Sequence, residues 1–100
     1  MLEFTIPSLV GRALPIWALA GRARLAGVRG HLEYDETKSS PRVLHIRCEA
    51  AMAVFFQKEL RRLAADATAS NEFDLHTATT RAMAAVESAI ASARDALPKS

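Results

Sequence analysis

The sequence contains a single cysteine, Cys48, among its 100 residues. One cysteine cannot form a disulfide within the chain, so we expect a protein of a reducing compartment, the cytoplasm. The first residues do not resemble a signal peptide, because Glu3 stands where a basic region belongs and Arg12 interrupts the apolar run. No stretch approaches the roughly eighteen uninterrupted apolar residues of a membrane span, so no membrane contact is expected.

Glycine, proline and aromatic residues are also scarce, whereas hydrophobic residues make up half of the chain. This composition excludes a disordered proline- or glycine-rich chain and provides enough apolar surface for a core. A chain of this length can build one such core, so we expect a single domain over residues 1–100. The core is modest in size, and a partner or a second copy could contribute further burial.

Charges of the two signs nearly balance, with a formal net charge of +2, which excludes a polybasic tail. Residues 1–30 nevertheless contain four arginines against Glu3 alone, so phosphate binding is the alternative hypothesis for this chain. These arginines are Arg12, Arg22, Arg24 and Arg29. The segment GVRG, residues 27–30, resembles the backbone-clamping G-x-x-G loop of KH domains. A strand pattern follows it here, where that family has a helix, so turn glycines are the simpler interpretation.

Residues 2–6 alternate apolar and polar side chains, which predicts a short, half-buried strand. Residues 8–26 are rich in alanine, leucine and arginine and predict a helix. Pro15 lies inside this segment and should break or kink the helix near Leu14. One kinked helix and two short helices both satisfy the pattern.

Alternation returns in residues 28–34 and 43–48, on either side of the polar segment 36–41. Two alternating runs around a polar loop predict a β-hairpin. We expect the register that places the apolar residues of both strands on one face. That register pairs Tyr34 with Leu44, Leu32 with Ile46, and Glu33 with His45.

Two helices are predicted after the hairpin, over residues 49–67 and 74–97, with Asp74 as the cap of the second and Pro98 beyond its end. Each carries an apolar stripe at helical spacing. The predicted order is therefore β-α-β-β-α-α. It defines an α+β fold in which a short antiparallel or mixed sheet packs helices on one face and a long helix ends the chain.

Cys48 lies directly before a predicted helix, where a thiol can have a lowered pKa, and His45 is a nearby base. Three residues along a strand place two side chains on opposite faces, however, and Cys48 shares the face of Leu44 and Ile46. We therefore interpret Cys48 as a core residue. The three histidines, His31, His45 and His76, lack the spacing of a metal site, so neither a metal nor another cofactor is predicted.

Glu59 falls near the middle of the apolar stripe of residues 49–67, and a buried carboxylate there needs a partner. Arg62, three residues later on the same helix face, is the predicted partner. The last helix carries a strip of alanines that allows close approach of a neighbour, in the same chain or in a second copy. The predicted partner-binding residues are Glu59, Arg62, Ala82, Ala85 and Ala89.

No motif supports catalysis, so the sequence predicts a non-catalytic module that binds a partner protein, with a homodimer through the last helix as one form. By analogy with other compact single domains, we expect a regulator or inhibitor carried by a mobile element, anti-CRISPR- or antitoxin-like. The alternative is a nucleic-acid-binding protein that uses the four arginines.

Overall fold

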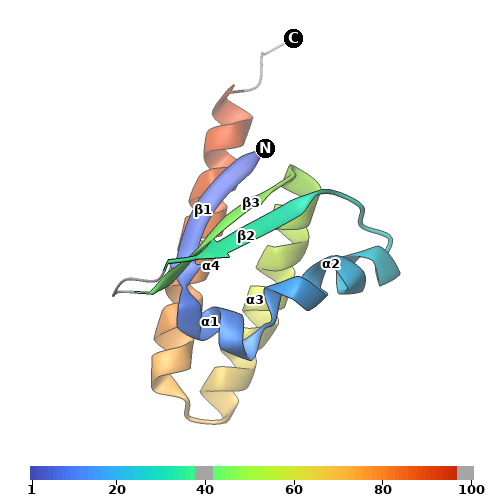
Figure 1. Ribbon diagram of the computed structural model, residues 1–100. Helices are drawn as coiled ribbons and strands as arrows, with labels where there is room; N and C mark the ends of the chain where they lie inside the picture. Colours follow the sequence, from blue (N-terminus) through green and yellow to red (C-terminus); the bar gives the residue numbers. More distant parts are fainter. Residues whose placement is uncertain (38–41, 97–100) are drawn as a thin grey trace.

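The computed structural model describes residues 1–37 and 42–96, with side chains to residue 94, and has the α+β order expected from the sequence (Figure 1). The elements are β1 (Leu2–Pro7), α1 (Ser8–Ala13), α2 (Ile16–Leu25), β2 (Leu32–Glu36), β3 (Val43–Cys48), α3 (Ala50–Ala69) and α4 (Phe73–Ala96). Residues 8–26 thus form two helices, because Pro15 ends the first and directly precedes the second. The predicted loop at 36–41 and the predicted helix end at 97 fall partly outside the described residues.

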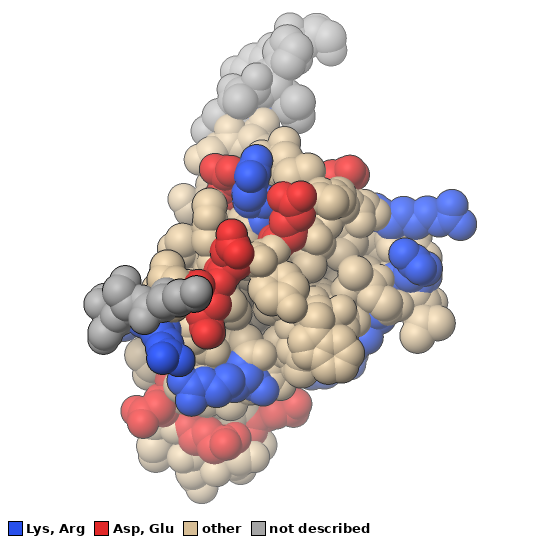
Figure 2. All heavy atoms as spheres, in the orientation of Figure 1, with Lys and Arg blue, Asp and Glu red and all other residues tan. Residues whose placement is uncertain are grey.

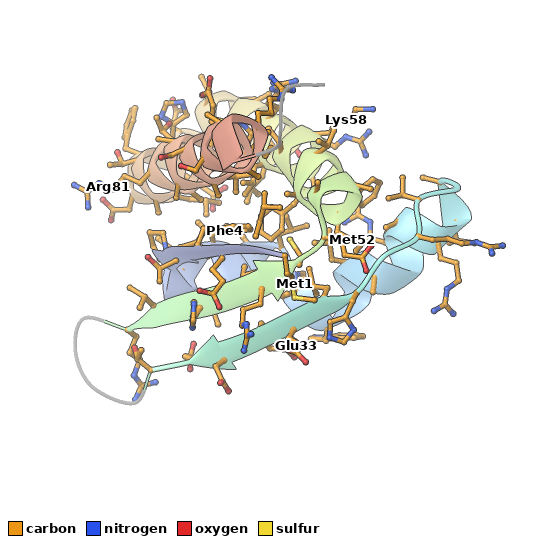
Figure 3. The ribbon with its side chains drawn as sticks, turned by 90° about the horizontal axis from the view of Figure 1, so that it is seen from above. Met1, Phe4, Glu33, Met52, Lys58 and Arg81 are labelled. Atoms are coloured by element: carbon orange, nitrogen blue, oxygen red, sulfur yellow. The ribbon has the colours of Figure 1, made fainter. Side chains whose placement is uncertain are left out.

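The three strands form one antiparallel sheet in the order β1-β3-β2. Alternation divides the side chains between two faces, and the apolar set faces the helices. Figure 3 shows Phe4 and Met52 between the sheet and the helices, and Glu33 on the open side. The buried positions of the two adjacent strands β1 and β3 are Leu2, Phe4, Ile6, Leu44, Ile46 and Cys48.

The predicted hairpin register is wrong by two residues. Tyr34 pairs with Ile46, and Glu33 pairs with Arg47. The ladder continues beyond the last apolar residue of β2, since Glu36 pairs with Leu44 and the Thr37 N–H donates to the Val43 carbonyl at 3.0 Å. A shift of two keeps every side chain on its own face, so alternation alone cannot distinguish the two registers.

The helices α3 and α4 run alongside each other and cover one face of the sheet (Figure 1). The Phe56 ring of α3 meets the Phe4 ring of β1 edge-to-face, with centroids 5.9 Å apart. α4 packs against both α3 and β1, and its Ala82 and Val86 are fully buried. Ala78 and Ala82 of the last helix are therefore buried within the chain, whereas Ala85 and Ala89 are half-buried.

Asn71 adopts a left-handed backbone conformation, which ends α3 and starts the turn into α4. The Glu72 N–H donates to the Ala67 carbonyl at 2.8 Å, and the Asn71 N–H donates to the Thr68 carbonyl at 3.2 Å. These two bonds are a Schellman motif, which satisfies the last carbonyls of α3. α4 then begins at Phe73, so Asp74 lies within its first turn and is not its cap as predicted. In the first turn, the negative charge of Asp74 still interacts favourably with the helix dipole.

Gly27 ends α2 in the same way, with a φ of +81°. The Val28 N–H donates to the Ala23 carbonyl at 2.8 Å, as a Schellman motif requires. Gly30 has a different role, since a Cβ there would lie 2.8 Å from Met52 Cγ. Both glycines of the GVRG segment are thus explained by the fold, which removes the reason to compare it with a backbone-clamping loop.

We predict that Gly27→Ala lowers the stability of the fold, because alanine is strained at a positive φ. The expected loss is about 1 kcal/mol of unfolding free energy, measured by urea denaturation. Gly21→Ala is the matched control, since no atom lies within 4 Å of a Cβ at either position and Gly21 lies within α2. It should stabilise the fold by up to about 1 kcal/mol. Equal effects of the two substitutions would contradict this account of the turn.

Candidate protein-binding surfaces

The one long-range ion pair with a buried partner joins α2 to α3 in the described part of the chain. The Arg22 Nη2 donates to Glu59 Oε2 at 2.9 Å, and the side chains are 43% and 10% exposed, respectively. Glu59 is therefore buried and paired, as expected, but its partner is not Arg62, which is exposed. α2 supplies the closer cation because it packs against α3 from outside.

The predicted partner-binding residues do not form one surface. Ala82 is fully buried in the core, and Glu59 is held by Arg22 at the α2–α3 contact. Ala85 and Ala89 are half-buried and line a hollow between α4 and β1. Only this alanine pair therefore combines partial exposure with a concave site.

The four N-terminal arginines are also divided. Arg22 is bound to Glu59, and Arg12 lies on α1. Arg24 and Arg29 line a separate hollow of about 380 Å³ beside Met52. The structure therefore does not gather these side chains into one basic patch, and Figure 2 shows blue groups in separate places on this face.

The open face of the sheet is polar, and two of the three histidines, His31 and His45, lie at this face. His31 Nε2 lies 2.9 Å from Glu33 Oε1, and this contact lowers the pKa of the Glu33 carboxyl. Arg47 Nε donates to Glu3 Oε1 at 2.9 Å, and His45 lies opposite Asp35 in the register of β3 and β2. Among the described residues, no group of three histidine, cysteine or acidic side chains could hold a metal ion. The red groups along the strands in Figure 2 belong to a solvated face.

Cys48 is fully buried, on the face opposite His45. Burial, followed by the negative charge of Glu49, raises the pKa of the thiol to about 11. A thiol that stays protonated near neutral pH is a poor nucleophile. The core interpretation of Cys48 is therefore supported by its position and by its surroundings.

We predict that Cys48 reacts with iodoacetamide much more slowly in the folded chain than in urea. A pKa near 11 instead of 9.0 reduces the thiolate at pH 8 roughly a hundredfold, and burial slows the reaction further. The measurement is the rate of mass increase by mass spectrometry. Alkylation of the folded chain at the unfolded rate would show that the thiol is accessible.

The ion pair between Arg22 and Glu59 should stabilise the fold. Arg22→Ala should lower the unfolding free energy by about 1–2 kcal/mol, because it leaves a buried carboxylate without a partner, although Arg22 itself is partly solvated. Arg62→Ala is the control and should change stability by less than about 0.5 kcal/mol. Urea denaturation of the two variants decides between the cations, and a larger loss from Arg62→Ala would contradict the observed pairing.

Large apolar side chains are exposed where α1, α2, β2 and the start of α4 meet. We call this area the aromatic surface and define it by Leu9, Arg12, Trp17, Tyr34 and Phe73. Trp17 and Phe73 are each 74% exposed, and Tyr34 is 44% exposed. Tyr34 lies on the face of Ile46, as expected, but it is exposed because β2 is an edge strand that the long helices cover only partly.

Two hollows give the aromatic surface its shape. One, of about 670 Å³, is lined by Leu9 and Phe73, and the other, of about 230 Å³, by Trp17 and Tyr34. Arg12 lines both, so the surface is continuous across its side chain. Arg12 forms no ion pair within the described residues, and its guanidinium is therefore available to an incoming group.

Neither Trp17 nor Phe73 was predicted from the sequence as a site residue. A signal for Trp17 exists, because the buried residues Ile16, Leu19 and Ala23 recur at helical spacing and place Trp17 off their stripe. This helical spacing could be interpreted only if a separate helix was already known to start after Pro15. Phe73 precedes the predicted helix start, so it was not assigned to any face.

Comparison with protein-family models, curated proteins and solved structures gives no match. No helix among the described residues is long and apolar enough to cross a membrane. The function must therefore be argued from the surfaces of this chain.

Proposed function

We propose that the protein is a small non-catalytic interaction module that binds a partner protein through the aromatic surface. The observation that carries this proposal is the exposure of Trp17 and Phe73 on either side of Arg12. Exposed apolar patches of this kind mark interaction sites, and tryptophan, tyrosine and arginine dominate the binding energy of known interfaces.

The shape of the surface indicates how such a partner binds. The two hollows accept apolar side chains, and Arg12 between them can pair with a carboxylate of the partner. Trp17 lies on α2 and Tyr34 on β2, so both anchors are attached to regular elements. Anchors that are already in position lose little conformational entropy on binding.

A chain that offers a binding surface can act on its partner by blocking or holding it. We therefore propose a role as a regulator or inhibitor, and the anti-CRISPR- or antitoxin-like analogy belongs to the same proposal. The nucleic-acid alternative has less support, because the four arginines are divided and Arg22 is bound to Glu59.

We predict that Trp17→Ala and Phe73→Ala abolish capture of the partner while the fold is retained. The tagged protein and its variants are used as bait in a lysate of the source organism, and captured proteins are identified by mass spectrometry. The affinity of the purified partner is then measured by calorimetry. Each substitution should weaken binding by about 2 kcal/mol, roughly thirtyfold.

Leu25→Ala is the matched control, because Leu25 is 90% exposed on α2 but lines neither hollow. It should capture the same protein as the unaltered chain. A partner that remains bound to both alanine variants would refute the aromatic surface. Steeply salt-dependent binding of an oligonucleotide, lost in Arg24→Glu, with no captured protein would favour the alternative instead.

A further inference from the structure

A groove between α3 and α4 lies on the outer side of the helix pair, and Figure 3 shows Lys58 on this side, away from the sheet. The groove has a volume of about 320 Å³. Its lining residues recur every three or four positions on both helices, so the groove follows the helix axes. They are Val54, Gln57, Lys58 and Arg61 of α3, and Glu87, Ile90, Ala91 and Arg94 of α4.

The α3–α4 groove is basic. Three of the charged side chains that line it are cations, Lys58, Arg61 and Arg94, and the fourth is the acid Glu87. None of the four forms an ion pair within the described residues. Uncharged residues occupy the next positions along the same helix faces, namely Ala50, Ala65 and Met83. The three cations are therefore available to an incoming anionic group.

Gln57 is the most buried residue that lines the groove, with 9% of its surface exposed. Its Oε1 is buried without a hydrogen-bond partner. Its Nε2 also lacks a partner within the described chain but is not buried, so its N–H groups are accessible from the groove. An unpaired buried oxygen costs stability, and an apolar side chain would avoid that cost. The amide places donors beside the three cations, and this set of donors suits carboxylate oxygens.

Apolar side chains lie between these charges. Val54 is 45% exposed, Ile90 is half-buried, and both line the groove with Ala91. A groove with an apolar strip and charged borders suits an amphipathic helix, which lays its apolar face along the strip. Because cations outnumber acids at the borders, the complementary helix carries acidic residues beside its apolar stripe. A small anion would leave Val54 and Ile90 uncovered.

We propose that the α3–α4 groove binds an acidic, amphipathic helix of a partner protein. The apolar stripe of that helix covers Val54 and Ile90. Its carboxylates pair with the three cations of the groove and accept the N–H groups of Gln57. The groove shares no residue with the aromatic surface, so the proposal stands independently of the function proposed above.

The probe is the peptide acetyl-EELAALLEELAAE-amide, which has one apolar stripe flanked by glutamates. Its binding to the isotope-labelled full chain is followed by NMR titration. We expect shifts in residues 54–61 and 87–94, and weaker binding as salt is added, because salt screens exposed charges. The basic peptide acetyl-KKLAALLKKLAAK-amide should bind at least about fivefold more weakly. Equal binding of the two peptides would overturn the proposal.

Two arginines provide a matched pair of variants. Arg61→Glu and Arg81→Glu change the net charge equally, and both positions are exposed. Only Arg61 lines the groove, and Figure 3 shows Arg81 far from Lys58. Arg61→Glu should weaken binding of the acidic peptide roughly fivefold or more, and Arg81→Glu less than about twofold. Equal weakening would show that net charge alone attracts the peptide and would overturn the proposal.

Gln57→Met separates binding from stability, because methionine has a similar length but lacks the amide. The urea midpoint of unfolding should not fall, since the unpaired oxygen is removed. Binding of the acidic peptide should nevertheless weaken about two- to fivefold, because the N–H donors are lost. Unchanged binding would overturn the role of Gln57.

Further probes identify the kind of occupant. The peptide acetyl-EESAASSEESAAE-amide keeps the charges without the apolar stripe and should bind at least about tenfold more weakly. The peptide acetyl-EELAAPLEELAAE-amide should also lose binding, because proline interrupts a helix. Trp17→Ala should leave binding of the acidic peptide unchanged, which separates this test from that of the aromatic surface. Inorganic phosphate or a short oligonucleotide that binds the groove as tightly as the leucine peptide would make it a general anion site and overturn the proposal.

Discussion

The close packing of α4 against β1 determines the arrangement of the rest of the chain. The helix packs against both β1 and α3, and its Ala78, Ala82 and Val86 are buried. α3 then packs beside α4 over the apolar face, where Phe56 meets Phe4. β2, at the opposite edge, remains only partly covered, and α1 and α2 lie beside it. Both candidate surfaces follow from this placement.

The two surfaces differ in physical character. The aromatic surface combines large apolar side chains with Arg12, which forms no ion pair within the described residues, and suits a partner that brings apolar groups into shallow hollows. The hollow between β1 and α4 is instead lined mainly by small side chains of the helix.

Much of the fold could be predicted from the sequence, because alternation and helical spacing report which residues share a face. The alternation of side chains along residues 43–48 was enough to place Cys48 in the core. The register of the hairpin was not determined, since a shift of two residues preserves every face. Alternation also does not report how far a covering helix extends, so it gave the face of Tyr34 but not its exposure.

The candidate sites were less predictable, because they depend on contacts between distant segments. Arg22 lies thirty-seven residues before Glu59, so local spacing suggested Arg62 in its place. The alanines of α4 were correctly expected to meet a neighbour, but sequence alone could not say whether it belonged to the same chain. Trp17 and Phe73 come together with Arg12 only after α1, α2 and α4 have packed.

Trp17 is the single tryptophan of the chain, so its fluorescence reports the aromatic surface directly. The most direct test is acrylamide quenching of Trp17 emission, before and after the captured partner is added. We predict strong quenching and a solvent-exposed spectrum for the free protein, then a blue shift and protection in the complex. Unchanged quenching in a complex shown to have formed would contradict the proposed binding surface.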